Sequence, residues 1–311
     1  MRHIYIDASD HFIDTSGVIL GTANFESADR EELAHKVYDR YVERGGLAFD
    51  LRRGVGEEIL GRWLKGWRGR DRLTVITKGG RCGVDMATCR ESLKDDIEAS
   101  LTALGTHIDL YMPGCGFDYP DALLETLDEY VRSGDIRAVG AANRTLDTID
   151  EVNRVAFERG LPPMVASSVQ WSLAVVDRDA LREAFGEGCI GLNADGEYSG
   201  YRHRDTLLLA YSALAWGYFC KRIWGETPRF ADALDGEENE HRLALVRRWS
   251  EKTGRSPAEI SLAYVLSHPE INAAAVVAVE SLKQLEELMR VGDYLLPYEF
   301  FEELGEVAVR V

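Results

Sequence analysis

The sequence predicts an α/β fold in which eight βα units close into a (β/α)8 barrel, also called a TIM barrel. Short apolar segments alternate with longer amphipathic segments along all 311 residues, the pattern of parallel strands connected by helices. No segment rich in Pro, Gly or Ser divides the chain. Such barrels run to about 250 residues before extensions. We therefore expect a single domain over residues 1–311, with an N-terminal hairpin and extended C-terminal loops.

The eight predicted strands are short, mostly apolar and not alternating, as expected of strands buried on both faces. The segment 1–14 precedes the first strand and is expected to form the hairpin at the floor of the barrel. In chain order the predicted strands span 18–21, 47–50, 73–77, 108–112, 137–140, 164–168, 207–211 and 274–277.

The segments between these strands carry apolar residues at helical spacing, and several stop at a glycine that is typical of a helix C-terminus. Leu93, Ile97 and Leu101, for example, lie four residues apart and are followed by Gly105. The predicted helices span 30–44, 57–67, 89–104, 122–133, 146–159, 239–253, 257–267 and 281–291.

Charge and composition exclude several classes of partner. The chain has 36 Lys and Arg residues against 53 Asp and Glu residues, which gives a net charge of −17 and an isoelectric point near 4.9. Such a field repels nucleic acids and anionic membranes. The sequence has no apolar run near the roughly 20 residues of a membrane span, and no apolar signal segment at its N-terminus. We expect a cytoplasmic protein that binds a small molecule, and its oligomeric state stays open.

Cysteine usage indicates neither a disulfide framework nor a metal site. The chain has five cysteines, an odd number, and no Cys-x-x-Cys pair. We therefore expect ordinary thiols and no metal. The cysteines are Cys82, Cys89, Cys115, Cys189 and Cys220.

Two charged residues end neighbouring apolar strands. Chemistry in a (β/α)8 barrel takes place at the carboxyl ends of the strands. Asp50 ends the second predicted strand and Lys78 follows the third. Neighbouring strands lie about 5 Å apart, so we expect these side chains to pair across the mouth of the barrel. Such a pair biases the pKa of a nearby acid, although a purely structural ion pair has the same pattern.

Motifs along nearly the whole chain resemble those of the aldo-keto reductases, in the order of that family. The resemblance implies a barrel that transfers a hydride between a nicotinamide cofactor and a small carbonyl, sugar or alcohol. The matching segments are 20–25 (LGTANF), 49–50 (FD), 56–64 (GEEILGRWL), 76–78 (ITK), 108–111 (IDLY), 139–143 (VGAAN), 168–173 (SVQWSL), 210–214 (AYSAL) and 281–287 (SLKQLEE).

The chain departs from the family at two positions of its catalytic tetrad of Asp, Tyr, Lys and His. By resemblance, Asp50 and Lys78 occupy the Asp and Lys positions. The tyrosine normally stands five residues after the aspartate, where this chain has Val55, and the histidine position is Gly114. Neither side chain donates a proton, and a positioned acid contributes roughly 10²- to 10⁴-fold. We therefore expect the family's usual route of carbonyl reduction to be badly impaired.

Residues around the vacated positions are candidates for new roles. Tyr119, on the loop after the fourth strand, is the best replacement proton donor by chemistry. A guanidinium binds an anionic or keto substrate but is a poor acid, because its pKa lies above about 12. Each of these residues also fits a solvated or packed loop, and the aromatic cluster around Trp216 fits either a lid or ordinary loop packing. The predicted substrate contacts are Arg52, Arg53, Val55, Gly114 and Trp216.

The cofactor positions match the family more closely. By resemblance, Asn143 and Gln170 bind the nicotinamide carboxamide and Trp171 stands near its ring. Glu280 replaces the arginine that usually binds the 2′-phosphate, and a carboxylate repels that phosphate while it accepts a hydrogen bond from a free 2′-hydroxyl. NAD is therefore favoured over NADP. The other predicted cofactor contacts are Gly21, Thr22, Tyr211, Ser212, Leu214, Ser281 and Gln284.

Three functions fit these observations. The first is an aldo-keto-reductase-like oxidoreductase with an altered proton donor. The second is a lyase, dehydratase or isomerase in which Asp50 and Lys78 perform acid and base catalysis without hydride transfer. The third is an inactive, cofactor-binding regulatory homologue. Fold alone does not decide among them.

Overall fold

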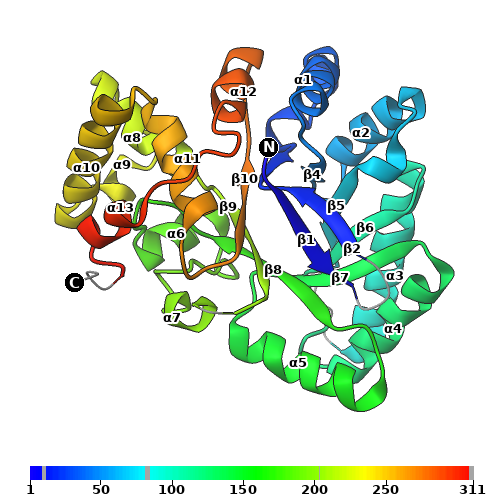
Figure 1. The fold of residues 1–311 in the computed structure, drawn as a ribbon. Helices are drawn as coiled ribbons and strands as arrows, with labels where there is room; N and C mark the ends of the chain where they lie inside the picture. The colour runs from blue at the N-terminus through cyan, green and yellow to red at the C-terminus, as the bar shows by residue number, and fades with distance from the viewer. Residues whose placement is uncertain (9–11, 81–84, 203, 308–311) are drawn as a thin grey trace.

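A closed barrel of eight parallel strands forms the centre of the molecule, and helices surround it (Figure 1). The computed structural model describes residues 1–8, 12–80, 85–202 and 204–307, so Cys82 lies outside the described residues. The predicted fold class is confirmed, and each predicted strand matches an observed one to within two residues at either end. In barrel order the strands are β10 (Ala273–Val277), β3 (Val18–Gly21), β4 (Ala48–Asp50), β5 (Thr74–Gly79), β6 (Ile108–Pro113), β7 (Ile136–Ala142), β8 (Met164–Gln170) and β9 (Leu207–Tyr211).

The expected N-terminal hairpin closes the floor of the barrel. Strands β1 (His3–Asp7) and β2 (Phe12–Ser16) pair antiparallel, with Ile6 opposite Ile13. Alternate residues of the hairpin are buried against the side chains inside the barrel, and Thr74 donates a hydrogen bond to the Asp14 carbonyl oxygen over 2.7 Å. The open end is therefore the carboxyl end of the strands.

The predicted helices are all present with small shifts at their ends. They are α1 (Glu31–Glu43), α2 (Val55–Gly66), α3 (Met86–Leu104), α4 (Pro120–Ser133), α5 (Leu146–Arg159), α10 (Glu237–Thr253), α11 (Pro257–Ser267) and α12 (Leu282–Met289). Gly105 ends α3 with a φ of 67°, a left-handed conformation that glycine adopts without strain. The structure adds α6 (Arg178–Phe185), α7 (Tyr198–Tyr201), α8 (Tyr218–Trp224), α9 (Ala231–Leu234), α13 (Tyr298–Glu303) and the 3₁₀ turns η1 (Ala23–Phe25), η2 (Ala28–Arg30), η3 (Arg70–Arg72) and η4 (Ala215–Gly217).

Strand alternation decides which side chains face the inside of the barrel. One apolar cluster combines the hairpin isoleucines with alternate residues of the barrel strands, including Ala48, Ile76 and Leu209. A second and larger cluster lies between the strands and the helices. Because side chains two residues apart share a face, Asp50 and Lys78 point inward at the carboxyl ends of their strands.

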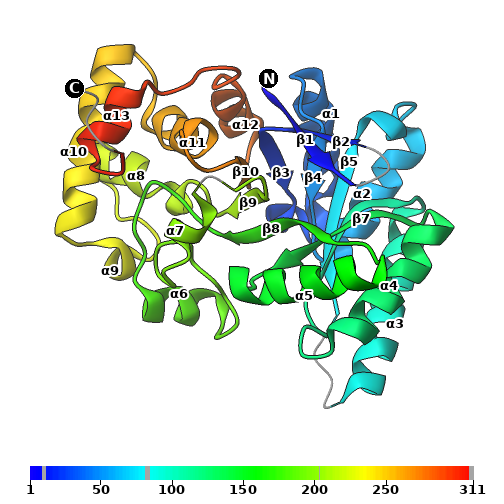
Figure 2. The same ribbon diagram turned by 60° about the horizontal axis from the view of Figure 1, so that its bottom comes forward.

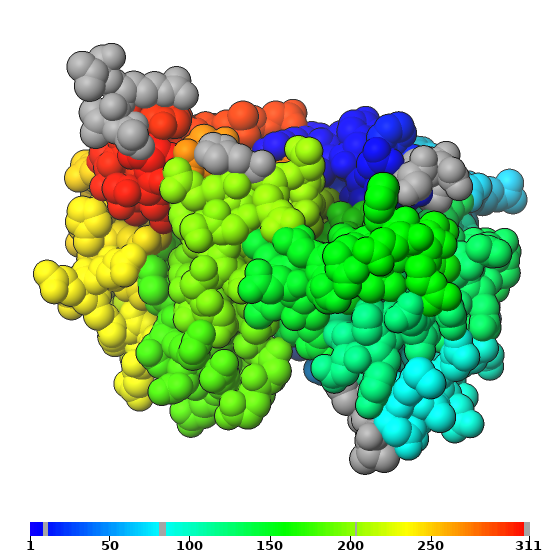
Figure 3. Space-filling view, turned by 90° about the horizontal axis from the view of Figure 1, so that it is seen from below, coloured from blue at the N-terminus to red at the C-terminus, as the bar shows by residue number. Residues whose placement is uncertain are grey.

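The connection between β8 and β9 places an extra segment at the mouth of the barrel. After α6, the chain returns to β8, where Gly191 forms a parallel bridge with Gln170. We call residues 186–192 the β8–β9 segment. Figure 2 shows α6 at the same end of the molecule as the start of α3, and Figure 3 shows the surface hollowed between these two parts. This segment therefore extends the wall of the barrel beyond the end of β8.

Candidate active site

The closed barrel places two predicted pairs of residues on opposite walls. Strands β5 and β9 lie four strands apart in either direction around the barrel, and so do β4 and β8. Lys78 on β5 therefore faces Tyr211 on β9, and Asp50 on β4 faces Gln170 on β8. Tyr211 packs against the apolar cluster inside the barrel. These four side chains frame the mouth.

Asp50 and Lys78 form the expected ion pair. Lys78 Nζ donates a hydrogen bond to Asp50 Oδ1, and the two side chains are 23% and 12% exposed. Asp50 pairs in register with Ile76, two residues before Lys78, so the adjacent strands hold the two groups together. This partial burial keeps the ammonium group in contact with the mouth while its charge is balanced.

Both arginines of the loop after β4 are bound to carboxylates. Arg52 contacts both carboxylate oxygens of Glu26, and Arg53 forms an ion pair with Asp96, which is 5% exposed. The hydrogen bonds from Arg52 to Glu26 raise the pKa of the arginine further. These two predicted substrate contacts are therefore anchors of their loop in this structure.

The two altered tetrad positions differ in the space around them. Val55 is the first residue of α2 and its side chain is 41% exposed. Gly114, in contrast, donates a hydrogen bond to the Gly79 carbonyl oxygen over 2.6 Å, and a Cβ atom on it would lie only 2.7 Å from the Gly80 carbonyl oxygen. A histidine side chain at this position would require the backbone to move.

Arg144 occupies the corner beside Gly114, and the sequence assigned it no role. Its guanidinium donates hydrogen bonds to the main-chain oxygens of Asn143, at 2.8 Å, and Gly114, at 2.6 Å. The same group lies 4.6 Å from the centre of the Phe117 ring. Its position directly after Asn143 at the end of a strand was the signal available in the sequence.

Asn143 is held by Tyr211 and by the β8–β9 segment. Its Oδ1 atom accepts hydrogen bonds from the Tyr211 hydroxyl, at 2.9 Å, and from the Ile190 amide, at 3.2 Å. Its φ of 51° is unusual for a residue other than glycine. Gln170 is 4% exposed, and its main chain exchanges hydrogen bonds with Ile190 and Leu192. The structure therefore brings three predicted carboxamide and ring contacts together.

Three predicted aromatic residues lie elsewhere. Because Gln170 points inward, Trp171 points outward, where its ring centre lies 5.3 Å from that of Tyr264 between the barrel and α11. This placement does not fit the predicted contact with a cofactor ring. Tyr119 precedes α4 and lines a small cavity between α3 and α4 whose lining includes neither Asp50 nor Lys78. Trp216 stacks on Phe185 at 5.2 Å, beside Tyr211 rather than over the mouth.

The remaining predicted cofactor residues lie at the ends of β3, β9 and β10. Ser212, with a φ of 52°, and Leu214 form the turn after β9. Ser281 caps α12 by accepting a hydrogen bond from the Gln284 amide, and Gln284 Oε1 accepts one from the Glu280 amide over 2.6 Å. The residues at the start of the barrel, Gly21 and Thr22, are buried, and the Thr22 hydroxyl has no partner among the described residues.

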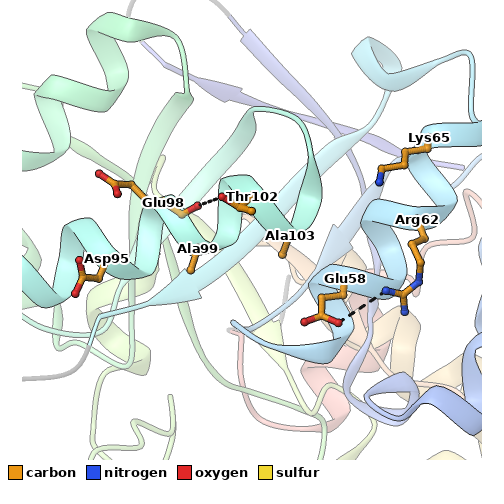
Figure 4. Close-up of a pocket in the computed structure, with 8 residues that line it drawn as sticks. All are labelled: Glu58, Arg62, Lys65, Asp95, Glu98, Ala99, Thr102 and Ala103. Atoms are coloured by element: carbon orange, nitrogen blue, oxygen red, sulfur yellow. Dashed lines mark hydrogen bonds and ion pairs between the residues drawn. The ribbon is translucent and has the colours of Figure 1, made fainter.

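The largest hollow lies away from the mouth. It is a solvent-open groove of about 760 Å³ on the outside of the barrel, between α2 and α3 (Figure 4). Its charged residues partly pair with one another, with Arg62 lying 3.8 Å from Glu58. The helices approach closely here, because a Cβ on Gly61 would lie 2.1 Å from the Ala103 carbonyl oxygen. No predicted site residue lines the groove, which is lined by Glu58, Arg62, Lys65, Asp95, Glu98, Ala99, Thr102 and Ala103.

The family follows from a comparison with known proteins. A model of the Aldo/keto reductase family matches residues 17–309. The chain belongs to this family. Protein tas of Escherichia coli K12 is 26% identical over 322 residues, which cover 88% of each chain.

Solved structures share the fold of this aldo/keto reductase. A thermostable aldo-keto reductase in complex with the inhibitor epalrestat aligns with a TM-score of 0.73 and 21% identity over 98% of both chains. An aldo/keto reductase from Klebsiella pneumoniae in complex with NADP and acetate aligns with a TM-score of 0.67 and 19% identity, over 96% of this chain and 93% of the other. Among the described residues, no helix has the length and apolar character to cross a membrane, and no cluster of metal-binding side chains occurs.

Proposed function

We propose that this aldo/keto reductase is a nicotinamide-dependent oxidoreductase that acts on a small carbonyl, sugar or alcohol with an altered proton donor. The observation that carries the proposal is the opposition of Lys78 and Tyr211 across the mouth. A flat ring lying on Tyr211 would present its other face toward Lys78. When bound, the nicotinamide supplies or accepts the hydride.

Two unpartnered polar atoms support the fit of a nicotinamide carboxamide. Tyr211 and Ile190 engage the Oδ1 atom of Asn143, which leaves its Nδ2 atom without a partner among the described residues. Gln170 Oε1 likewise has no hydrogen-bond partner in the part of the chain that is described. An N–H donor beside a carbonyl acceptor complements a primary carboxamide. Asn143 and Gln170 would therefore hold this group.

We assign the proton transfer to Lys78. Of the four side chains that frame the mouth, Lys78 and Tyr211 carry a proton at neutral pH, but the Tyr211 hydroxyl is donated to Asn143 and burial raises the pKa of this tyrosine. In reduction, an N–H bond of Lys78 breaks as an O–H bond forms on the substrate oxygen. Water then restores the proton, since the side chain is partly exposed. Asp50 keeps the ammonium group oriented. Tyr119 stays the alternative donor.

We propose NAD rather than NADP as the cofactor because Glu280 is exposed beside the first turn of α12. Its carboxylate repels a 2′-phosphate and accepts a hydrogen bond from a free 2′-hydroxyl. Ser281 and Gln284, which lie in the same turn, would meet the adenosine.

Titration of the protein with NADH and NADPH, followed by nicotinamide fluorescence, tests cofactor binding. Stopped-flow oxidation of the bound NADH against a panel of small carbonyl compounds then tests hydride transfer. Binding with oxidation supports the proposal. Binding without oxidation of any compound would favour a regulatory, cofactor-binding protein. Absence of binding would overturn the redox proposal in favour of a lyase, dehydratase or isomerase.

A further inference from the structure

The cations on the loops at the mouth differ in how their charge is balanced. Arg52 is paired with Glu26, Arg53 with Asp96, and Lys78 with Asp50. Arg144, on the loop after β7, has no carboxylate partner among the residues that the structure describes, and its guanidinium contacts only main-chain oxygens and a ring. In a chain of net charge −17, this half-buried positive charge is unexpected.

The guanidinium of Arg144 is fixed in place before any ligand arrives. Hydrogen bonds to Asn143 and Gly114, together with the Phe117 ring, restrain its rotation. Of its five N–H donors, these bonds use two, and three are left for another acceptor. A planar guanidinium with free donors suits a carboxylate or phosphate group, and the restraint lowers the entropic cost of binding.

We propose that Arg144 binds an anionic group of the substrate, which makes the substrate a small carbonyl compound or alcohol that carries a carboxylate or phosphate. The inference rests on the proposed function and names its substrate class. Arg144 meets Gly114, which follows the end of β6, and Lys78 pairs in register with Met112 on that strand. Neighbouring strands lie about 5 Å apart, so the two cations are separated by on the order of 10 Å. The anion and the reacting carbon are therefore a few bonds apart.

Gly114 has a defined part in this arrangement. The close approach of its backbone to Gly80 excludes a side chain from the corner, and its carbonyl oxygen orients Arg144. A fixed cation thus replaces the family's neutral hydrogen-bonding side chain as the polar group of the corner.

Matched substrate pairs test the proposal. With NADH-loaded protein, we expect 4-oxobutanoate to have a lower KM than butanal, and glyceraldehyde 3-phosphate a lower KM than glyceraldehyde, each by roughly tenfold or more, since a charged hydrogen bond has that effect. The two pairs distinguish carboxylate from phosphate. Succinate and inorganic phosphate, titrated by calorimetry without turnover, should bind with the same preference and should bind more weakly as salt increases.

Variants separate this role from a structural one. Arg144→Gln should weaken anion binding roughly tenfold or more and leave the KM of butanal unchanged, while Arg144→Lys should retain part of the effect. Arg159→Gln, on the outer face of α5 with Asp121 and Glu125, is the control and should change neither. Equal affinity of the native protein for charged and uncharged substrates would overturn the proposal even if Arg144→Gln fails to fold. Failure of NADH to bind would instead refute the proposed function, because anion binding is measured without the cofactor.

Discussion

The hydroxyl of Tyr211 donates a hydrogen bond to Asn143 Oδ1 over 2.9 Å, which joins β9 to the end of β7 across the intervening strand β8. Asn143 is thereby oriented with its amide nitrogen available. Tyr211 would thus have two roles, since its ring faces Lys78 while its hydroxyl positions the group that would bind the carboxamide.

Tyr211→Phe should weaken NADH binding about five- to tenfold, because loss of one hydrogen bond costs about 1 kcal/mol. Fluorescence titration measures the change, and Tyr130→Phe, whose hydroxyl contacts Glu98 on the outer helices, is the control. Burial raises the pKa of Tyr211, so its hydroxyl stays protonated and the difference between the two proteins should be the same from about pH 6 to pH 9. Equal NADH affinity of the native and Tyr211→Phe proteins would contradict this role.

Lys78→Met should lower the single-turnover rate by roughly 10²- to 10⁴-fold with little change in NADH affinity, because it removes the proposed acid but no proposed cofactor contact. Lys78→Arg should not restore the rate, since the guanidinium pKa lies above about 12. Tyr119→Phe is the matched variant and should keep the native rate. A loss in Tyr119→Phe alone would transfer the proton donor role to Tyr119.

Gly114→Ala should destabilise the protein by about 1–3 kcal/mol, because its Cβ would lie 2.7 Å from the Gly80 carbonyl oxygen. Gly188→Ala is the control, since a Cβ there meets no atom within 4 Å. Urea unfolding gives both values. Equal stability of the two variants would show that the corner relaxes, and Gly114→His would then be a reasonable way to restore the family's histidine.

Asp109→Asn should cost about 3–5 kcal/mol, since it leaves the arginines around a buried carboxylate without a counter-charge. Burial alone would raise the pKa of Asp109, but His107, Arg70 and the Val75 amide outweigh burial and lower it below 3.8. The stabilisation from Asp109 is therefore complete above the unfolded pKa and is lost as pH falls through the lower folded value. Asp121→Asn, at an exposed pair with Arg159, should cost less than about 1 kcal/mol. Comparable losses at the two sites would contradict this account.

Glu280→Arg should shift the ratio of NADPH to NADH affinity upward by roughly tenfold, because a repulsive charge beside the 2′-position becomes attractive. Fluorescence titration with both cofactors measures the ratio. Glu226→Arg changes the net charge equally at another exposed position and should leave the ratio unchanged.

The sequence predicted the barrel well because each strand is an uninterrupted apolar segment between punctuating glycines and charges. The contact between Asp50 and Lys78 was predictable as well, since both residues end adjacent parallel strands. Trp171 shows what the motif alone missed: once Gln170 points inward, pleating turns the next residue outward.

The β8–β9 segment and Arg144 were not predictable from local pattern. Residues 186–192 have no apolar period, and their position depends on main-chain pairing with Gln170, which any sequence of suitable length can make. The role of Arg144 depends on the carbonyl oxygen of Gly114, thirty residues earlier in the chain. Both features arise from long-range contacts.

The hairpin beneath the barrel has a kinetic consequence. With β1 and β2 packed into one end, the cavity is a blind well, and all molecules reach its depth by the same opening. A substrate that arrived first would stand between the solvent and the dinucleotide's place on the wall. Turnover should therefore follow a compulsory order, with the dinucleotide entering first and leaving last.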